Sequence, residues 1–335
     1  MNKRISFLDA AKGLAIFTVV YSHICLFCMT PSSNSVIIEF LRTFFLNAFF
    51  FISGFFAFRE PLNGFKLKTN LQNKTIQLLL PSLIMGFLFA YEYSIPIDSF
   101  IYDSAKYGYW FTIVLYEMFV IWFLILAICN LIKKDISIVL IIVMSLLCYS
   151  CHKFVVFNQN FPDIFCVRNL INYFIYFGGG IISKKYQIPI KNLVFRRNGI
   201  LITMIFIIIV LNNLFTLPSI IYNFIIIFIV LLILAQIYKQ KFKFALLEKI
   251  KMSLAFLGKY TLEIYFLHYF LLFKLPEPLQ YFIRPSESMP SSAILEFVII
   301  GSLSLIISIL CILFSICLKQ IPYISLLAFG KKIKD

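Results

Sequence analysis

The chain has 335 residues, of which 61% are hydrophobic and only 13% are charged, and its mean hydropathy is +0.93. A water-soluble domain of this length cannot bury so much apolar surface, so the composition excludes a soluble protein and indicates a polytopic membrane protein. The formal net charge of +15 is explained by membrane topology, with some attraction for an anionic cytoplasmic ligand, and needs no nucleic-acid partner.

Apolar runs long enough to cross a bilayer predict about ten transmembrane helices. They define an all-α polytopic integral membrane protein in which nearly every residue belongs to a span or a short connection. We therefore expect a single transmembrane domain over residues 1–335, without an appended soluble domain. In chain order, the predicted spans are 7–29, 38–58, 75–95, 109–132, 136–152, 166–183, 198–215, 218–238, 253–274 and 293–318.

The distribution of lysine and arginine orients these spans. With the N-terminus inside, most basic residues fall in the inner loops and at the chain ends, and the outer loops hold only Lys106, Lys153, Arg168, Lys274 and Arg284. This asymmetry follows the positive-inside rule, and an odd number of spans would scramble it. Both termini are therefore predicted to be cytoplasmic.

The first predicted span carries Asp9, Lys12 and His23, although ionisable side chains are costly in hydrocarbon. Lys12 and His23 lie about 16 Å apart along a helix, which is about half the thickness of the hydrocarbon core. An imidazole is well suited to accept a proton from a hydroxyl at neutral pH. The pattern predicts a site that is reached from both sides of the membrane.

Later spans place more polar groups at a similar depth. Arg42 enters at the outer end of the second span, Glu117 lies in the outer half of the fourth below Trp110, and His268 lies in the outer half of the ninth. These positions predict a cavity open to the outer side, with Glu117 as a candidate to orient the His23 ring. The alternative is that each group only holds helices together by a polar contact.

Glycine and cysteine patterns favour packing roles. Gly54, after Ser53, and the run Gly178–Gly180 permit close helix approach. Ser53 can bond a neighbouring helix or a ligand. The C-x-x-C pairs Cys25/Cys28 and Cys148/Cys151 have no histidine or further cysteine at ligand spacing, so buried apolar thiols are favoured over a zinc or redox site.

The opening Asp9-x-x-Lys12-Gly13, with His23 at the spacing Lys-x10-His, resembles the start of the membrane-bound acyltransferase-3 family. The further matches are Ser53-Gly54-Phe55, Trp110-Phe111 and the segment from Gly258 to His268, so the resemblance runs over essentially the whole chain. The Lys-Gly form is similar to the branch of small stand-alone sugar O-acetylases described as fucose 4-O-acetylase-like.

This resemblance implies a ten-helix enzyme of the bacterial cytoplasmic membrane. Such an enzyme takes an acyl group, usually acetyl, from cytoplasmic acetyl-coenzyme A and passes it to a hydroxyl of a cell-envelope saccharide or lipid-linked glycan. No permanently bound cofactor or metal is expected. His23 matches the family's essential histidine, Lys12 its basic partner, and Asp9 the acidic residue ahead of it.

The chemistry assigns candidate roles within this scheme. His23 is the expected general base on the acceptor hydroxyl, in preference to a transient acyl-histidine, with Asp9 and Glu117 grouped beside it. The oxyanion-stabilising group stays open among Ser22, Tyr21, Tyr265 and Trp110. The expected donor-binding residues, which meet the phosphates of coenzyme A at the cytoplasmic face, are Lys12, Ser53, Arg59 and Lys74. The expected acceptor-binding residues are Arg42, Trp110, Tyr265 and His268.

Two positions depart from the family pattern. Many members carry an Arg-x-x-Arg pair before the proline of the third span, where this chain has Lys74-Thr75-Ile76-Gln77 before Pro81. The serine usual in the ninth-span motif is Thr261 here. The first departure bears on the donor-phosphate contacts more than on the overall activity.

Two other functions compete with acyl transfer. A glycan exporter or flippase of the same superfamily would use the buried polar groups to line a permeation path and would tolerate His23→Gln. A non-catalytic partner of a polysaccharide synthase would bind no coenzyme A at its basic inner face.

Overall fold

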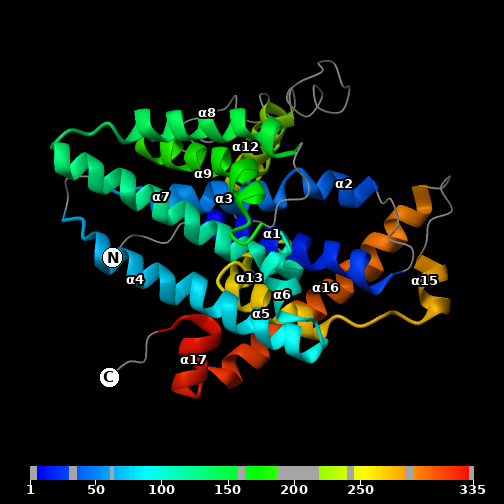
Figure 1. The fold of residues 1–335 in the computed structure, drawn as a ribbon. Coiled ribbons are helices and arrows are strands. Elements are labelled where there is room, and N and C mark those ends of the chain that lie inside the picture. The colour runs from blue at the N-terminus through cyan, green and yellow to red at the C-terminus, as the bar shows by residue number, and fades with distance from the viewer. Residues whose placement is uncertain are drawn as a thin grey trace. The chain divides into compact units, whose positions relative to one another are not determined.

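The computed structural model describes residues 6–29, 36–60, 64–156, 163–186, 219–239, 245–283 and 290–331. Within these ranges the chain forms helices and no strand, as predicted (Figure 1). The predicted span 198–215 lies outside the described residues. Contacts divide the chain into two compact units. Unit 1 holds Met1–Phe49 and Gln187–Phe314, and unit 2 holds Phe50–Tyr186 and Ser315–Asp335.

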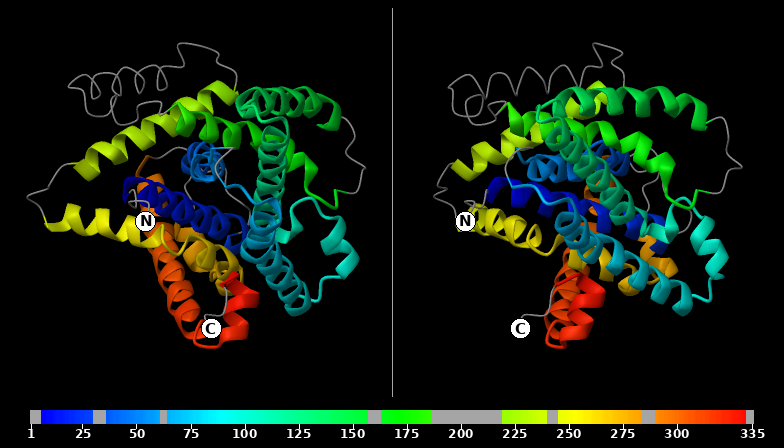
Figure 2. Two further views of the ribbon diagram at one scale, coloured as in Figure 1. Left: turned by 90° about the vertical axis from the view of Figure 1, so that its left-hand side faces the viewer. Right: turned by 60° about the vertical axis from the view of Figure 1, so that its left-hand side comes forward.

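Unit 1 is built around the first helix, α1 (Ser6–His23), which continues into a π-helical turn, η1 (Ile24–Cys28). The α1 helix packs against three later helices of the unit, as Figures 1 and 2 show for α12 and α13. These three helices are α12 (Ser219–Lys239), α13 (Ala245–Leu257) and α14 (Thr261–Leu267). The unit also contains α2 (Val36–Arg42), the 3-10 turn η4 (His268–Leu271), α15 (Glu277–Ile283) and most of α16 (Pro290–Leu318).

Unit 2 is centred on α7 (Trp110–Ile132), which contacts α4 (Leu67–Lys74), α8 (Ser137–Val156) and α9 (Val167–Lys185). Trp122 of α7 is fully buried, and its indole N–H donates to the carbonyl of Ala57 at 3.0 Å. The other elements are most of α3 (Phe45–Ala57), the π-helical turn η2 (Thr75–Leu79), α5 (Leu80–Glu92), α6 (Ile97–Tyr102), the 3-10 turn η3 (Lys106–Gly108) and α17 (Pro322–Phe329).

The two π-helical turns have different local surroundings. The turn η2 precedes Pro81, whose missing N–H removes the bond to the carbonyl four residues earlier. A π-helical turn at that point lets α4 and α5 continue as one rod over residues 67–92 instead of breaking. The turn η1 follows His23 directly, without a proline.

Five described helices are long and apolar enough to cross a membrane: Ser6–Cys28, Leu67–Glu92, Trp110–Ile132, Ser219–Tyr238 and Ile294–Leu318. They coincide with five of the predicted spans, although the predicted span 75–95 begins eight residues too late. The shorter apolar helices Phe45–Ala57 and Ser137–Cys151 fall within 38–58 and 136–152, and α9 coincides with 166–183. The total of about ten spans and the cytoplasmic termini stay predictions.

The prediction of one continuous helix over 253–274 is wrong. The α13 helix ends at Leu257 and α14 begins at Thr261, because the backbone at Gly258 lies directly against the Asp9 carbonyl of α1. The Thr261 hydroxyl donates to the Gly258 carbonyl at 3.0 Å and so satisfies an acceptor near the break. The predicted helix 38–58 is likewise interrupted, by a turn between α2 and α3.

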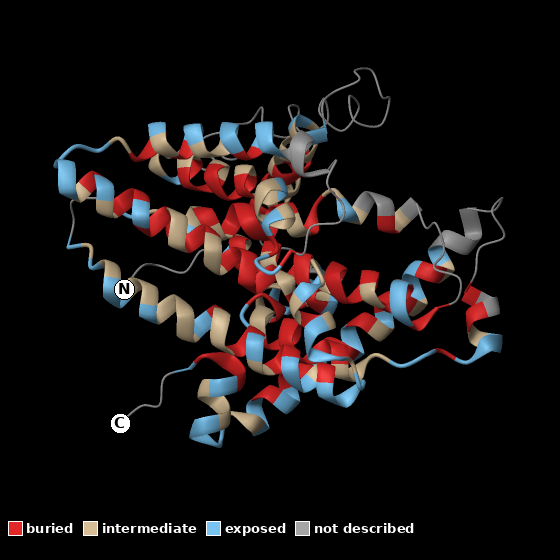
Figure 3. Cartoon of the chain, in the orientation of Figure 1, coloured by how far each residue is buried: buried red, intermediate tan, exposed pale blue. Residues whose placement is uncertain are grey.

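Large apolar side chains are exposed along α8 and α16, where Figure 3 shows exposed positions recurring from turn to turn. On α16 they include Phe297, Leu313 and Phe314, which are 48%, 54% and 50% exposed. An exposed apolar face of this kind is unfavourable in water, but it is the ordinary surface of a helix that contacts lipid.

Reciprocal glycine contacts join α3 and α9 in unit 2, and they confirm the predicted packing role of these glycines. A Cβ atom at Gly54 would overlap the Phe177 carbonyl oxygen, and one at Gly180 would overlap the Phe51 carbonyl oxygen. Each helix therefore lies in the space left by the other's missing side chain.

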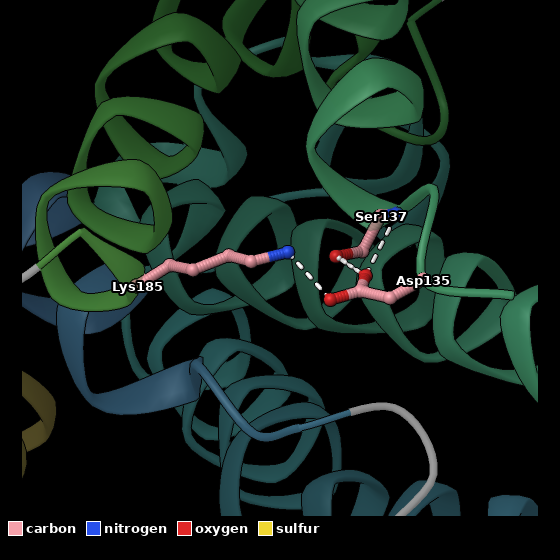
Figure 4. Close-up of polar contacts among 3 residues, drawn as sticks. All are labelled: Asp135, Ser137 and Lys185. Carbon is pink, nitrogen blue, oxygen red and sulfur yellow. Dashed lines mark hydrogen bonds and ion pairs between the residues drawn. The ribbon is translucent and has the colours of Figure 1, made fainter.

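A polar clasp joins the α7–α8 connection to the end of α9 (Figure 4). Asp135 accepts hydrogen bonds from the backbone N–H and the hydroxyl of Ser137, at 3.2 and 2.6 Å, and so caps the start of α8. Its other carboxylate oxygen lies 2.5 Å from the Lys185 ammonium. Burial alone would raise the pKa of Asp135, but the bonds from Lys185 and Ser137 outweigh it and hold the pKa below its usual value of 3.8.

We expect Asp135→Asn to lower the thermal stability of the detergent-solubilised protein at pH 7 by about 1 kcal/mol or less, because the carboxylate is partly exposed and screened. A carboxyl whose pKa is lower in the folded state stabilises the fold above its unfolded pKa, and it loses this contribution as the pH falls through the folded pKa. The difference between variant and wild type should therefore shrink below about pH 4. Melting curves at pH 7 and pH 3 measure this change, with Lys134→Gln in the same turn as the control. A difference that is constant with pH would contradict the ion-pair explanation.

Candidate active site

Two histidines meet inside unit 1. The Nδ1 atom of His23, at the end of α1, lies 2.8 Å from Nε2 of His268, at the start of η4. Their planes are 6° from parallel and their centroids are 5.0 Å apart, so the two rings meet edge to edge in nearly one plane. The Nδ1–H of His268 donates to the Ile264 carbonyl at 3.0 Å, and the Tyr269 hydroxyl lies 3.3 Å from Nε2 of His23. His268 has no exposed surface, whereas His23 is half-buried.

The crossing of α1 and α13 places these histidines together. A Cβ atom at Gly13 would overlap the Leu254 carbonyl oxygen, and one at Gly258 would overlap the Asp9 carbonyl oxygen. The two glycines therefore bring the backbones into direct contact. Each histidine follows its glycine by ten residues. The prediction that these helices carry polar groups to a similar depth is confirmed for this pair.

A main-chain hydrogen bond holds the far side of the pair. The N–H of Leu275 donates to the carbonyl of Cys28, the last residue of η1, at 3.0 Å. The histidine pair thus lies in a segment that is fixed by backbone contacts before and after it.

Asp9 and Lys12 form an ion pair of 2.8 Å near the start of α1. The Asp9 side chain is only 6% exposed, and that of Lys12 is 26% exposed. Fourteen residues separate Asp9 from His23, which is about 21 Å along a helix. Asp9 is thus paired with Lys12, and its catalytic role, like the phosphate-binding role of Lys12, stays a prediction.

The sequence interpretation missed Glu296, a carboxylate on α16 with 1% exposure. It accepts a hydrogen bond from the Tyr21 hydroxyl at 3.1 Å, and its Oε1 atom lies 4.0 Å from the Cys25 sulfur. Its position within the predicted span 293–318 could have identified it, since an ionisable residue within a span is a functional candidate by default. Tyr269 was also missed, although it follows His268 directly.

Ser22, one of the oxyanion candidates, has a buried hydroxyl with no hydrogen-bond partner among the described residues. Other helical hydroxyls of this chain, such as Ser82 and Ser304, bond the carbonyl four residues earlier. The Ser22 hydroxyl makes no such bond. Tyr21 instead bonds Glu296, and Tyr265 is buried with its ring centroid 6.2 Å from that of His268.

Unit 2 presents an aromatic cluster at the start of α7. The Trp110 ring stacks on Tyr173 of α9 with centroids 5.5 Å apart, and Tyr173 stacks on Phe50 of α3 at 5.0 Å. Trp110 and Tyr173 are half-buried. Flat aromatic faces of this kind suit the apolar face of a sugar ring as well as helix packing.

Glu117 lies two turns after Trp110 on α7, in unit 2. One of its carboxylate oxygens is buried without a hydrogen-bond partner among the described residues. Its charged neighbours are Asp163 and Lys106, and the buried Lys106 ammonium donates to three backbone carbonyls at 2.6 to 3.0 Å. The described contact of the His23 ring is with His268, within unit 1, and the role of Glu117 as the orienting group stays a prediction.

Two predicted donor-binding cations lie close together in unit 2. The Lys74 ammonium sits 4.0 Å from the centre of the Phe119 ring, and Arg59 is near enough for the two like charges to interact. Arg59 donates to the Asn70 side chain at 2.8 Å. Ser53 is half-buried on α3. In unit 1, Arg42 is exposed at the end of α2.

The cysteines behave mostly as predicted. All eight are free thiols, and Cys25, Cys28 and Cys148 are buried, but Cys151 is exposed and is not a packing residue. Within the described residues there is no group of three or more potential His, Cys, Asp or Glu metal ligands.

Comparison with known proteins bears on the whole chain. The family model described as an acyltransferase domain matches residues 5–313 of the 335. No curated protein and no solved structure matches the chain. The match includes both histidines, the Asp9–Lys12 pair, and the aromatic and cationic residues of unit 2.

Proposed function

Because the chain is a multi-pass member of the acyltransferase-3 family, we propose that it transfers acetyl groups to sugar hydroxyls. The donor is acetyl-coenzyme A on the cytoplasmic side of the bacterial cytoplasmic membrane, with both chain termini on that side. The acceptor is a hydroxyl of a cell-envelope or exopolysaccharide sugar. The observation that carries this proposal is His23, a half-buried imidazole within a membrane-spanning helix whose two ring nitrogens both face polar partners.

The proposed reaction is direct transfer. His23 takes the proton of the acceptor hydroxyl as the oxygen attacks the thioester carbonyl. The new C–O bond forms, the C–S bond breaks, and the coenzyme A thiolate leaves with the proton that His23 held. No net proton is released or consumed, so the imidazole returns to its starting state. The Ser22 hydroxyl, which has no hydrogen-bond partner among the described residues, is the proposed donor to the oxyanion of the intermediate.

The test is acetyl-coenzyme A turnover by the purified protein in detergent. Free thiol and radiolabelled acetyl-glycan are followed together, with and without an envelope-glycan extract. Thiol release that depends on the extract and matches label in the glycan supports acyl transfer. Glycan crossing of sealed vesicles without acetylation would replace the proposal with an exporter. A folded protein that neither releases thiol nor binds coenzyme A would replace it with a non-catalytic partner.

The donor site carries a separate prediction. We propose that Arg59 and Lys74 hold coenzyme A phosphates, because two adjacent cations match a polyphosphate. Arg59→Gln and Lys74→Gln should each raise the KM for acetyl-coenzyme A by about tenfold, or about 1.4 kcal/mol, with kcat little changed. Lys68→Gln, an exposed lysine of the same helix α4, is the control. A fall in kcat at unchanged KM would contradict phosphate binding.

A further inference from the structure

We propose that His268 is a positioning residue that fixes the tautomer of His23, so that the lone pair of His23 lies on Nε2. This deepens the proposed function, since it names the atom that accepts the proton. It also replaces the expected acceptor-binding role of His268 with a different one.

The hydrogen-bond chain carries the argument. The Ile264 carbonyl can only accept, so the His268 Nδ1 atom at 3.0 Å from it carries a proton. In a neutral ring the other nitrogen, Nε2, is then an acceptor. A doubly protonated His268 would place a cation at a position with no exposed surface, which is costly. His268 therefore presents a lone pair to His23.

The His23 nitrogen that faces this lone pair must therefore be a hydrogen-bond donor. Its Nδ1 atom lies 2.8 Å from the His268 lone pair, so Nδ1 carries the proton and Nε2 is bare. The Tyr269 hydroxyl can donate to that bare nitrogen at 3.3 Å. This contact is long enough to be exchanged for an acceptor hydroxyl. The chain of donors runs from Tyr269 through both imidazoles to the Ile264 carbonyl, and each link has one consistent direction.

The arrangement also accommodates the reaction. When Nε2 takes a proton from the acceptor hydroxyl, the Nδ1–H bond to His268 remains in place and no ring has to rotate. A carboxylate fixes the base in a Ser-His-Asp triad. Here the neutral His268 imidazole, itself oriented by the Ile264 carbonyl, takes the place of that carboxylate and fixes the tautomer of His23.

Nitrogen NMR tests the tautomer directly. The chain has only three histidines, so ¹⁵N-histidine labelling gives three rings, and the His152→Gln background leaves the two of interest. We expect protonated Nδ1 and bare Nε2 for both rings. His268→Leu should move the proton of His23 to Nε2, whereas His268→Gln, which keeps an acceptor oxygen, should leave it on Nδ1. Tyr269→Phe should not change the tautomer.

Kinetics separate positioning from folding. His268→Leu should lower kcat by about 10²- to 10⁴-fold with the KM for acetyl-coenzyme A unchanged, and His268→Gln should recover most of this loss. The inference is overturned if wild-type His23 carries its proton on Nε2, or if His268→Leu leaves it on Nδ1. If neither the wild type nor any variant releases thiol but the spectra are as expected, acyl transfer fails and the tautomer assignment stands.

Discussion

The variant His23→Gln is expected to lose acetyl transfer by about 10²- to 10⁴-fold, the range that a positioned general base contributes. Glutamine keeps a hydrogen-bond donor and an acceptor near the positions of the ring nitrogens, so it can still face His268 and Tyr269. It has no basic nitrogen, so it cannot take the hydroxyl proton. The measurement is kcat for glycan-dependent thiol release, with the melting temperature recorded on the same sample.

Two comparisons make this result specific. The affinity for acetyl-coenzyme A should be unchanged, because the proposed phosphate contacts lie elsewhere, at Arg59 and Lys74. His152→Gln, which removes the third histidine, should retain full activity. Transfer by His23→Gln at a tenth of the wild-type rate or more would exclude the base role of His23.

Gly258→Ala is expected to be the most disruptive single-methyl change in unit 1. The added Cβ would lie 2.6 Å from the Asp9 carbonyl carbon, and backbone cannot move aside as a flexible side chain can. Overpacking of this kind costs about 1–3 kcal/mol or more. Gly13→Ala makes the matching clash, 2.8 Å from the Leu254 carbonyl carbon. Both variants should lower the melting temperature in detergent, and activity should fall because the histidine pair depends on this crossing.

Gly301→Ala on α16 is the matched control. A Cβ there would meet only the Phe17 ring at 3.6 Å, an ordinary van der Waals contact. Since alanine is a better helix former than glycine, this variant should be neutral or slightly more stable. Equal losses at Gly301 and Gly258 would show that close α1–α13 contact is not the cause.

Composition and periodicity predict the helical membrane class here, and glycine spacing predicts the close contacts of Gly54 and Gly180, because these signals are local. These local signals do not predict the helix break at Gly258. The hydropathy of 253–274 is that of one continuous apolar segment. The break depends on a backbone contact with α1, which lies more than two hundred residues away in the chain. Only the fold reveals that contact.

In the candidate site, too, the sequence predicts which residues matter but not which of them are in contact. Intramembrane polarity picks out His23 and His268 because ionisable groups in a span are rare. Which of these groups touch is decided by tertiary packing, so the sequence could not predict the contact between His23 and His268. The ion pair of Asp9 with Lys12, by contrast, follows from the local i, i+3 spacing on one helix.

The histidine pair is fixed at both ends by main-chain atoms: the Gly13/Gly258 contact on one side and the bond from Leu275 to Cys28 on the other. Neither of these main-chain contacts depends on the identity of a large side chain. Substitutions can therefore accumulate over most of α1, α13 and α14 without moving the two imidazoles, provided that the two glycines persist. Purifying selection should fall on a few small residues and the histidines, while the surrounding helices drift.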